Sequence, residues 1–73
     1  MKYNERIRDL RVDADMSQEK IAKLLGVGQR TYCDYESGKT RIPVERLIIL
    51  AEFYDVDMDY ICGVTEERQH FTR

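Results

Sequence analysis

The stretch that decides the fold runs from Gln18 to Glu36 and reads QEKIAKLLGVGQRTYCDYE. Its first eight residues, Gln18 to Leu25, are good helix formers that would ordinarily extend the helix further. Instead the chain meets Gly26-Val27-Gly28, and a second helical pattern starts at Gln29. Gly26 suits a tight turn because glycine adopts a left-handed backbone at little cost. The stretch therefore predicts two short helices joined by a three-residue turn.

A short helix, a tight turn with glycine and a second short helix form the helix-turn-helix arrangement. Ala22 offers a small side chain where two steeply crossing helices approach each other. The inward packing of Ile21, Leu25, Val27 and Tyr32 is expected to fix the crossing angle. An ordinary helical hairpin is the alternative, and the residues around this stretch have to decide between the two.

The rest of the chain also shows a helical period and no strand pattern. We predict a first helix that Asn4 caps and that ends near residues 13–15, a third helix over 29–36, a fourth helix to about Tyr54 and a fifth over 58–62. Helix boundaries are expected at Ser17, Gly38, Pro43, Asp57 and Gly63.

The buried faces follow from the same period. Apolar residues expected on them are Ile7, Leu10, Ala14, Ile21, Ala22, Leu24, Leu25, Val44, Leu47, Ile48, Leu50, Ala51 and Tyr54. The polar face of the first helix is expected to carry Arg6, Arg8, Asp9 and Asp13. Residues 64–73 are expected to be a frayed tail.

Length and composition indicate one small domain. A chain of 73 residues buries only about 60% of the surface that its unfolded form exposes. Its two cysteines, Cys33 and Cys62, are too scattered to form a disulfide framework, and we expect Cys62 to pack in the core. The N-terminus has no signal-like apolar segment, and no apolar run approaches the length of a membrane span. We therefore expect a cytoplasmic protein with reduced thiols and no membrane partner.

The formal charge is −2 overall, but it is unevenly distributed. Residues 1–46 hold ten Lys and Arg against eight Asp and Glu, a net charge of +2. Residues 47–73 hold two basic and six acidic residues, a net charge of −4. This asymmetry allows a polyanionic partner on the N-terminal side without requiring one.

Patterns typical of catalysis or metal binding are missing from the sequence. His70 and two distant cysteines make no zinc pattern, and Asp55, Asp57 and Asp59 lack the glycine and glutamate of a calcium loop. No nucleophile–base pair or glycine-rich phosphate loop is present. We therefore expect no metal, no cofactor and no enzyme activity. A redox role for Cys33 has no visible activating cluster to support it.

The order of the residues resembles one known family, the phage repressor and Cro type of helix-turn-helix protein, also called the Xre family. The resemblance covers residues 3–65 without a gap. It is carried by Ser17-Gln18-Glu19, Ile21-Ala22, Leu25-Gly26-Val27, Tyr35-Glu36-Ser37-Gly38-Lys39, Pro43, Leu47 through Ala51, and Asp57 through Gly63. It implies an all-α, five-helix lambda-repressor-like DNA-binding domain over residues 1–65, with the motif at 17–36 and a tail at 66–73.

The resemblance also implies which side chains read DNA, because the family inserts its third helix into the major groove. The expected base contacts are Gln29, Arg30 and Asp34, with Gly28 at the start of the helix. Gln pairs well with adenine and Arg with guanine. Asp34 would either hold Arg30 in place or accept from a cytosine amino group. A solvated surface ion pair between them is the alternative.

Further roles follow from the same resemblance. Contacts to DNA phosphates are expected from Ser17, Gln18, Thr31, Ser37, Lys39 and Arg41. Arg11 and Glu36 are expected to form a partly buried ion pair between the first and third helices. Dimerisation is expected to use the fifth helix and the tail, through Tyr60, Ile61 and Val64.

These features favour a transcriptional regulator that recognises a specific sequence in double-stranded DNA. Repression of a palindromic operator by a homodimer is the behaviour that the resemblance implies. The alternative is an antitoxin-like or protein-interaction module, in which the acidic half binds a protein partner. The basic residues near the third helix place DNA binding first.

Overall fold

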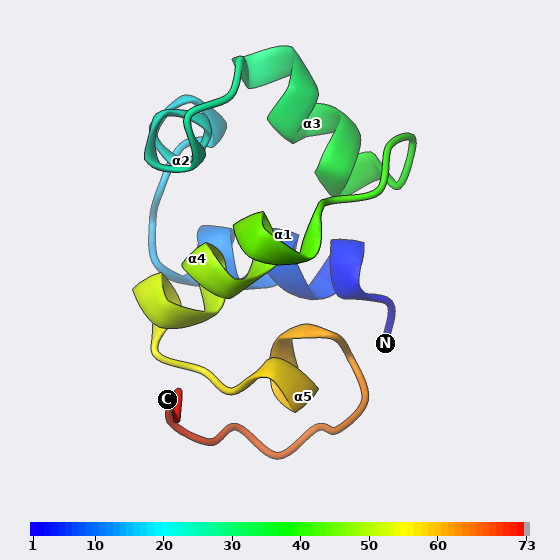
Figure 1. Ribbon diagram of the computed structural model, residues 1–73, viewed down its shortest axis with the longest axis vertical. Helices are drawn as coiled ribbons and strands as arrows, with labels where there is room; N and C mark the ends of the chain where they lie inside the picture. The colour runs from blue at the N-terminus through cyan, green and yellow to red at the C-terminus, as the bar shows by residue number, and fades with distance from the viewer. Residues whose placement is uncertain (73) are drawn as a thin grey trace.

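The computed structural model describes residues 1–72. Its helices are α1 (Tyr3–Asp13), α2 (Gln18–Leu25), α3 (Gln29–Ser37), α4 (Val44–Tyr54) and α5 (Met58–Ile61). The described residues contain no strand, so the predicted all-α, five-helix fold is confirmed. In Figure 1, α2 and α3 lie at one end of the molecule, α1 and α4 cross its middle, and α5 with the C-terminal segment forms the other end.

The ends of α2 and α5 are set by local hydrogen bonds. The Ser17 hydroxyl accepts from the Lys20 backbone N–H at 3.1 Å, and the Asp57 carboxylate accepts from the Tyr60 N–H at 2.9 Å. Each bond satisfies one of the free N–H groups at a helix start. Gly26 ends α2 in the left-handed region, with φ at 72°. The predicted break between the two helices is therefore confirmed.

Asn4 does not cap α1, contrary to the sequence prediction. The helix starts two residues earlier than predicted, at Tyr3, with Lys2 at the cap position and no side-chain cap bond. The Asn4 amide instead donates to the backbone oxygen of Glu36 at 3.2 Å. The Asn4 side chain, which the capping rule placed at the helix start, thus bonds to a distant residue on α3 instead.

One apolar core joins all five helices. Its members are Ile7, Leu10, Ile21, Ala22, Leu25, Tyr32, Tyr35, Leu47, Leu50, Ala51, Tyr54, Val56 and Ile61. The sequence placed Ala14, Leu24 and Val44 on buried faces, but all three are exposed. Ala14 follows the end of α1, so the helical period no longer fixes its direction. Leu24 and Val44 lie on the sides of α2 and α4 that no neighbouring element covers.

Arg6 is buried, whereas the sequence placed it on the solvent face of α1. Its guanidinium donates to the backbone oxygen of Tyr60 at 2.8 Å and to the Glu66 carboxylate at 3.1 Å. The same group lies 3.8 Å from the centre of the Tyr60 ring, a cation–π distance. These contacts satisfy the buried charge and tie α1 to α5.

Residues 64–72 pack on the domain, so the expected frayed tail is wrong for these residues. The backbone N–H of Asp57 donates to the Gln69 oxygen at 2.9 Å. Phe71 packs against the core, and its N–H donates to the Asp55 carboxylate at 3.1 Å. Arg73, the last residue of the predicted tail, lies outside the described residues.

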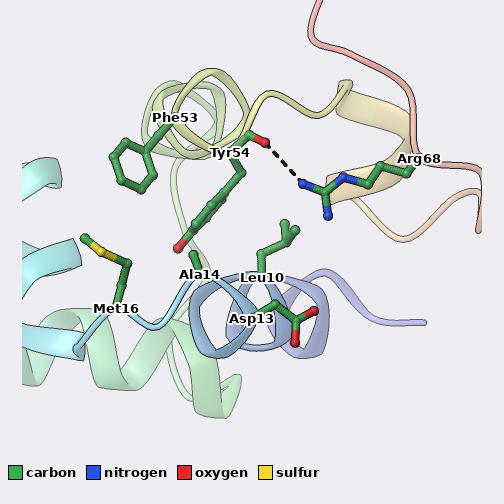
Figure 2. Close-up of a pocket in the computed structure, with 7 residues that line it drawn as sticks. All are labelled: Leu10, Asp13, Ala14, Met16, Phe53, Tyr54 and Arg68. Carbon is green, nitrogen blue, oxygen red and sulfur yellow. Dashed lines mark hydrogen bonds between the residues drawn. The ribbon is translucent and has the colours of Figure 1, made fainter.

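A hollow of about 380 Å³ separates the C-terminal ends of α1 and α4 (Figure 2). The ring of Tyr54 reaches across it toward Ala14. Its hydroxyl is buried and has no hydrogen-bond partner within residues 1–72. Arg68 closes one side of the hollow and donates to the backbone oxygen of Tyr54 at 3.4 Å. No residue of α3 lines the hollow, and it holds a polar group without a hydrogen-bond partner within residues 1–72.

Candidate nucleic-acid interface

The carboxylate of Glu36 joins three helices. Arg11 of α1 donates to both of its oxygens, at 2.7 Å from Nε and 3.1 Å from Nη2. Gln18 of α2 donates its amide N–H at 3.1 Å, and the hydroxyl of Tyr32 donates from one turn earlier in α3. The Arg11–Glu36 ion pair that the sequence analysis placed here is thus present, and it is one part of a larger network.

This network determines how Glu36 titrates. Burial raises the pKa of Glu36, but the hydrogen bonds from Arg11, Tyr32 and Gln18 outweigh burial and hold the pKa below its ordinary value. The hydrogen bond with Glu36 in turn raises the pKa of Arg11. Glu36 is therefore ionised at neutral pH, and its charge is matched within the fold.

The C-terminal end of α3 is held by α1 as well. Gly38 follows the helix with φ at 82°, a left-handed conformation that disfavours other residues. A Cβ atom at Gly38 would lie 3.3 Å from the Asn4 amide nitrogen, which is tighter than ordinary contact. Together with the Glu36 carboxylate network, the bond from the Asn4 amide to the Glu36 backbone oxygen fixes the direction of α3 relative to α1 and α2.

The first turn of α3 points away from the protein. Gln29, Arg30 and Thr31 are all exposed, and the Arg30 side chain is 82% accessible. Asp34 lies one turn further and is only 24% accessible, with a carboxylate oxygen 3.6 Å from Arg30 Nε. Gly28, at the cap position, has open space around its Cα. The predicted base-contact residues therefore lie next to one another on one exposed face.

The predicted phosphate contacts lie on both sides of this turn. Ser17 and Gln18 are at the start of α2, while Ser37 ends α3 and Lys39 and Arg41 follow in the loop. All are exposed except Gln18, which is half-buried. Because the Gln18 amide already donates one N–H to Glu36, only its second N–H remains for a phosphate. Its oxygen accepts from the Cys33 thiol at 2.9 Å.

The two cysteines are separate and free. Cys33 is half-buried between α3 and α2. Cys62 is exposed, so the expectation that it packs in the core is wrong. It follows the last residue of α5, where only one side of the chain meets the core. Although the residue is exposed, partial desolvation of its sulfur by neighbouring atoms, followed by the nearby charge of Asp59, raises the pKa of the Cys62 thiol. Residues 1–72 contain no group of three or more His, Cys, Asp or Glu side chains that could hold a metal ion.

The residues proposed for dimer contact are in different environments. Val64 is 76% exposed, whereas Tyr60 is half-buried beneath Arg6. Ile61 is fully buried within the chain itself. Its side chain is therefore unavailable to a partner, and the sequence prediction for Ile61 is wrong.

Sequence reasoning missed three polar side chains at this site. Asn4 of α1 positions α3 through its bond to the Glu36 backbone oxygen, and the Tyr32 hydroxyl, within α3, donates to the Glu36 carboxylate. Arg8 lines a hollow together with Ser37. The spacing of Asn4, Arg8 and Arg11 carried a signal, because residues three and four apart share one face of a helix. That stripe faces α3, but the sequence does not say which neighbour it meets.

These features define the class of the protein. Two short helices joined by a left-handed glycine turn, with the second helix held by a buried ion pair and its first turn exposed, form a helix-turn-helix domain of the phage-repressor type. The helix-turn-helix family model HTH_3 matches residues 7–61. The chain belongs to this family.

Curated relatives carry the same domain. The cryptic phage CTXphi transcriptional repressor RstR of Vibrio cholerae is 44% identical over 64 residues, which are 88% of this chain and 58% of that protein. An HTH-type transcriptional regulator of Bacillus subtilis, YobD, is 37% identical over 65 residues, which are 89% of this chain and 58% of that protein. The chain thus spans less than two thirds of the length of either relative.

A solved structure shows the same arrangement. The crystal structure of a transcriptional regulator from Listeria innocua superposes with a TM-score of 0.83 at 32% identity, over 90% of this chain and 62% of that one. In addition, none of the helices within residues 1–72 has the length and apolar character that crossing a membrane requires.

Proposed function

We propose that this chain is a sequence-specific DNA-binding domain of a transcriptional repressor, and that it binds a palindromic operator as a homodimer. The observation that carries the proposal is the exposed first turn of α3, with Gln29, Arg30 and Thr31 side by side on a helix whose direction the Glu36 network fixes. The major groove admits a helix in this orientation, and a rigid helix keeps its side chains in register with the base edges.

The side chains divide into two roles. Gln29 is suited to a bidentate bond with adenine, and Arg30 to one with guanine. Asp34, with a carboxylate oxygen 3.6 Å from Arg30 Nε, either orients the guanidinium in the complex or accepts from a cytosine amino group, and Gly28 lets the start of the helix approach the bases. Ser17, Gln18, Thr31, Ser37, Lys39 and Arg41 contact phosphates and set the position of the helix without reading sequence.

Charge predicts the strength of binding. The formal charge is −2, so attraction to DNA in general is small and specific contacts have to supply much of the affinity. Dimerisation through Tyr60 and Val64 would keep the acidic end of the chain away from the duplex, since α5 lies opposite α3 (Figure 1). The homodimer, the operator symmetry and a cytoplasmic location belong to the proposal. Repression is supported by the relative that is itself a phage repressor.

The test is selection of a random duplex pool at two salt concentrations, followed by sequencing. The wild type is compared with the double variant Gln29→Ala/Arg30→Ala. The matched control is Arg68→Ala/Gln69→Ala, which removes the same residue types from the C-terminal segment at the opposite end of the molecule (Figure 1). Because Arg68 lies 6.0 Å from the centre of the Tyr60 ring, in the region expected to form the dimer, sedimentation verifies that the control keeps the wild-type oligomeric state. Circular dichroism and melting temperature verify that each variant is folded.

We expect an enriched palindrome for the wild type and the control, and none for the α3 variant. Each lost bidentate contact is worth about 1–3 kcal/mol of discrimination, so losing two removes most of the enrichment. Enrichment that survives in the Gln29→Ala/Arg30→Ala variant would contradict the assigned roles. Wild-type protein that enriches no sequence would favour the protein-interaction alternative.

A further inference from the structure

We propose that Arg8 of α1 binds a phosphate of the DNA backbone in a shallow hollow next to α3. This inference rests on the proposed function and adds to it a helix outside the helix-turn-helix motif. The hollow has a volume of about 330 Å³ and opens on the surface. It is lined by Arg8, Gln18, Cys33, Glu36 and Ser37. Two of these residues are already assigned to phosphate contact on other grounds.

The position of Arg8 follows from the helical stripe on α1. Asn4 donates to the backbone oxygen of Glu36, and Arg11 pairs with the carboxylate of the same residue. Arg8 lies four residues after Asn4 and three before Arg11, so it shares their face of the helix. The two neighbours are occupied with α3, which leaves Arg8 at the rim of the hollow beside Ser37.

The charges around the hollow favour an anion. Glu36 lines it, but the bidentate pair with Arg11 matches that carboxylate charge. The Arg8 side chain is 62% exposed, and within residues 1–72 its only ion-pair contact is with exposed Asp9 at 3.8 Å. Exposed pairs of this kind contribute little and exchange readily, so Arg8 is free to turn toward a phosphate.

Neutral donors complete the site. The Gln18 amide gives one N–H to Glu36 and keeps the other. The exposed hydroxyl of Ser37 donates weakly to the Asp34 backbone oxygen, at 3.3 Å, and can donate to a phosphate oxygen instead. A guanidinium, an amide and a hydroxyl that line the same hollow match the several oxygens of one phosphodiester.

The experiment measures binding to the enriched operator and to a random-sequence duplex over a range of salt concentrations. The variants are Arg8→Gln, Arg8→Lys and, as the matched control, Arg68→Gln on the C-terminal segment. One phosphate contact contributes about 0.9 to the slope of log affinity against log salt. Arg8→Gln is therefore expected to lower the slope by about 1 for each bound subunit and to weaken both duplexes equally.

Arg8→Lys restores the slope because the charge returns, and Arg68→Gln leaves it unchanged. The melting temperature of Arg8→Gln stays at the wild-type value, since Arg8 makes no buried contact. If the wild type binds but Arg8→Gln leaves the slope of log affinity against log salt unchanged, this inference is overturned and the proposed function still stands. If Arg68→Gln lowers the salt slope as much as Arg8→Gln does, the inference is also overturned, because the effect would then come from the overall charge of the protein. Wild-type protein that binds neither duplex overturns both.

Discussion

Two tyrosine-to-phenylalanine variants test the Glu36 network with the same chemical change in two environments. Tyr32 and Tyr54 are both buried core residues. The hydroxyl of Tyr32 donates to the Glu36 carboxylate, whereas that of Tyr54 has no partner within residues 1–72. Burial raises the pKa of Tyr54 to about 12, so this hydroxyl is neutral at working pH. Burial, and then the hydrogen bond to Glu36, likewise raise the pKa of Tyr32.

The two substitutions are expected to change the free energy of unfolding in different ways. A hydrogen bond to a charged group is worth about 1.5–3 kcal/mol, so Tyr32→Phe should lower the free energy of unfolding by about 2 kcal/mol. In a domain of this size, that corresponds to a fall of about 8–16 °C in melting temperature. Tyr54→Phe removes a buried hydroxyl that lacks a partner, so we expect no loss and a gain of up to about 1 kcal/mol.

Urea denaturation followed by circular dichroism at neutral pH measures both variants against the wild type. Because each substitution removes a single oxygen, the slope of the denaturation curve should stay constant, and the midpoint should carry the effect. The double variant provides a further check, with the two changes expected to add if Tyr54 takes no part in the network. Equal losses from the two variants, or no loss from Tyr32→Phe, would refute the assignment of the Tyr32 hydroxyl to Glu36.

Four further substitutions test other contacts. Arg11→Met should cost about 3–5 kcal/mol at neutral pH because it leaves the buried carboxylate of Glu36 without its cation. Because the pKa of Glu36 is lower in the folded than in the unfolded protein, its ionised carboxylate stabilises the wild type. This stabilisation is fully present above the pKa that Glu36 has in the unfolded chain, and it is lost as the pH falls through the pKa that Glu36 has in the folded protein. The cost should therefore stay nearly constant in urea titrations from about pH 7 down to about pH 5 and shrink as the pH falls further, through the ordinary glutamate pKa and below it; a cost that stays constant below about pH 4 would contradict the charge argument. Gly38→Ala should lower the free energy of unfolding by about 1–3 kcal/mol, because alanine is strained at the positive φ of this position. Gly28→Ser should leave the free energy of unfolding unchanged, because Gly28 has a negative φ and open space around it. Thermal melts compare the two variants with the wild type. Ser17→Ala removes the cap of α2 and should lose about 1 kcal/mol in the same melts, and a neutral result would mean that water replaces the cap.

The sequence by itself determined the elements and their order. Glycine at position 26 stopped one helix, and Ser17 and Asp57 marked the starts of two others. Each of these signals is local, since a cap or a left-handed residue acts on its own helix end. The exposed turn with Gln29 and Arg30 was expected from the resemblance to the family, which inserts its third helix into the major groove. The pairing of Arg11 with Glu36 came from resemblance to a family, because the spacing of two residues in different helices does not show that they meet.

Only the tertiary structure decided what each polar side chain on α1 contacts. Arg6 is buried under α5, Asn4 binds α3, and Arg8 lies at the rim of a hollow, although all three are polar residues of one helix. A helical period says which residues share a face, but the angle at which α1 crosses its neighbours determines what that face meets. Ile61 shows the same limit, because α5 is too short for its period to distinguish a buried side from an exposed one. These assignments depend on long-range packing, which one helix does not encode.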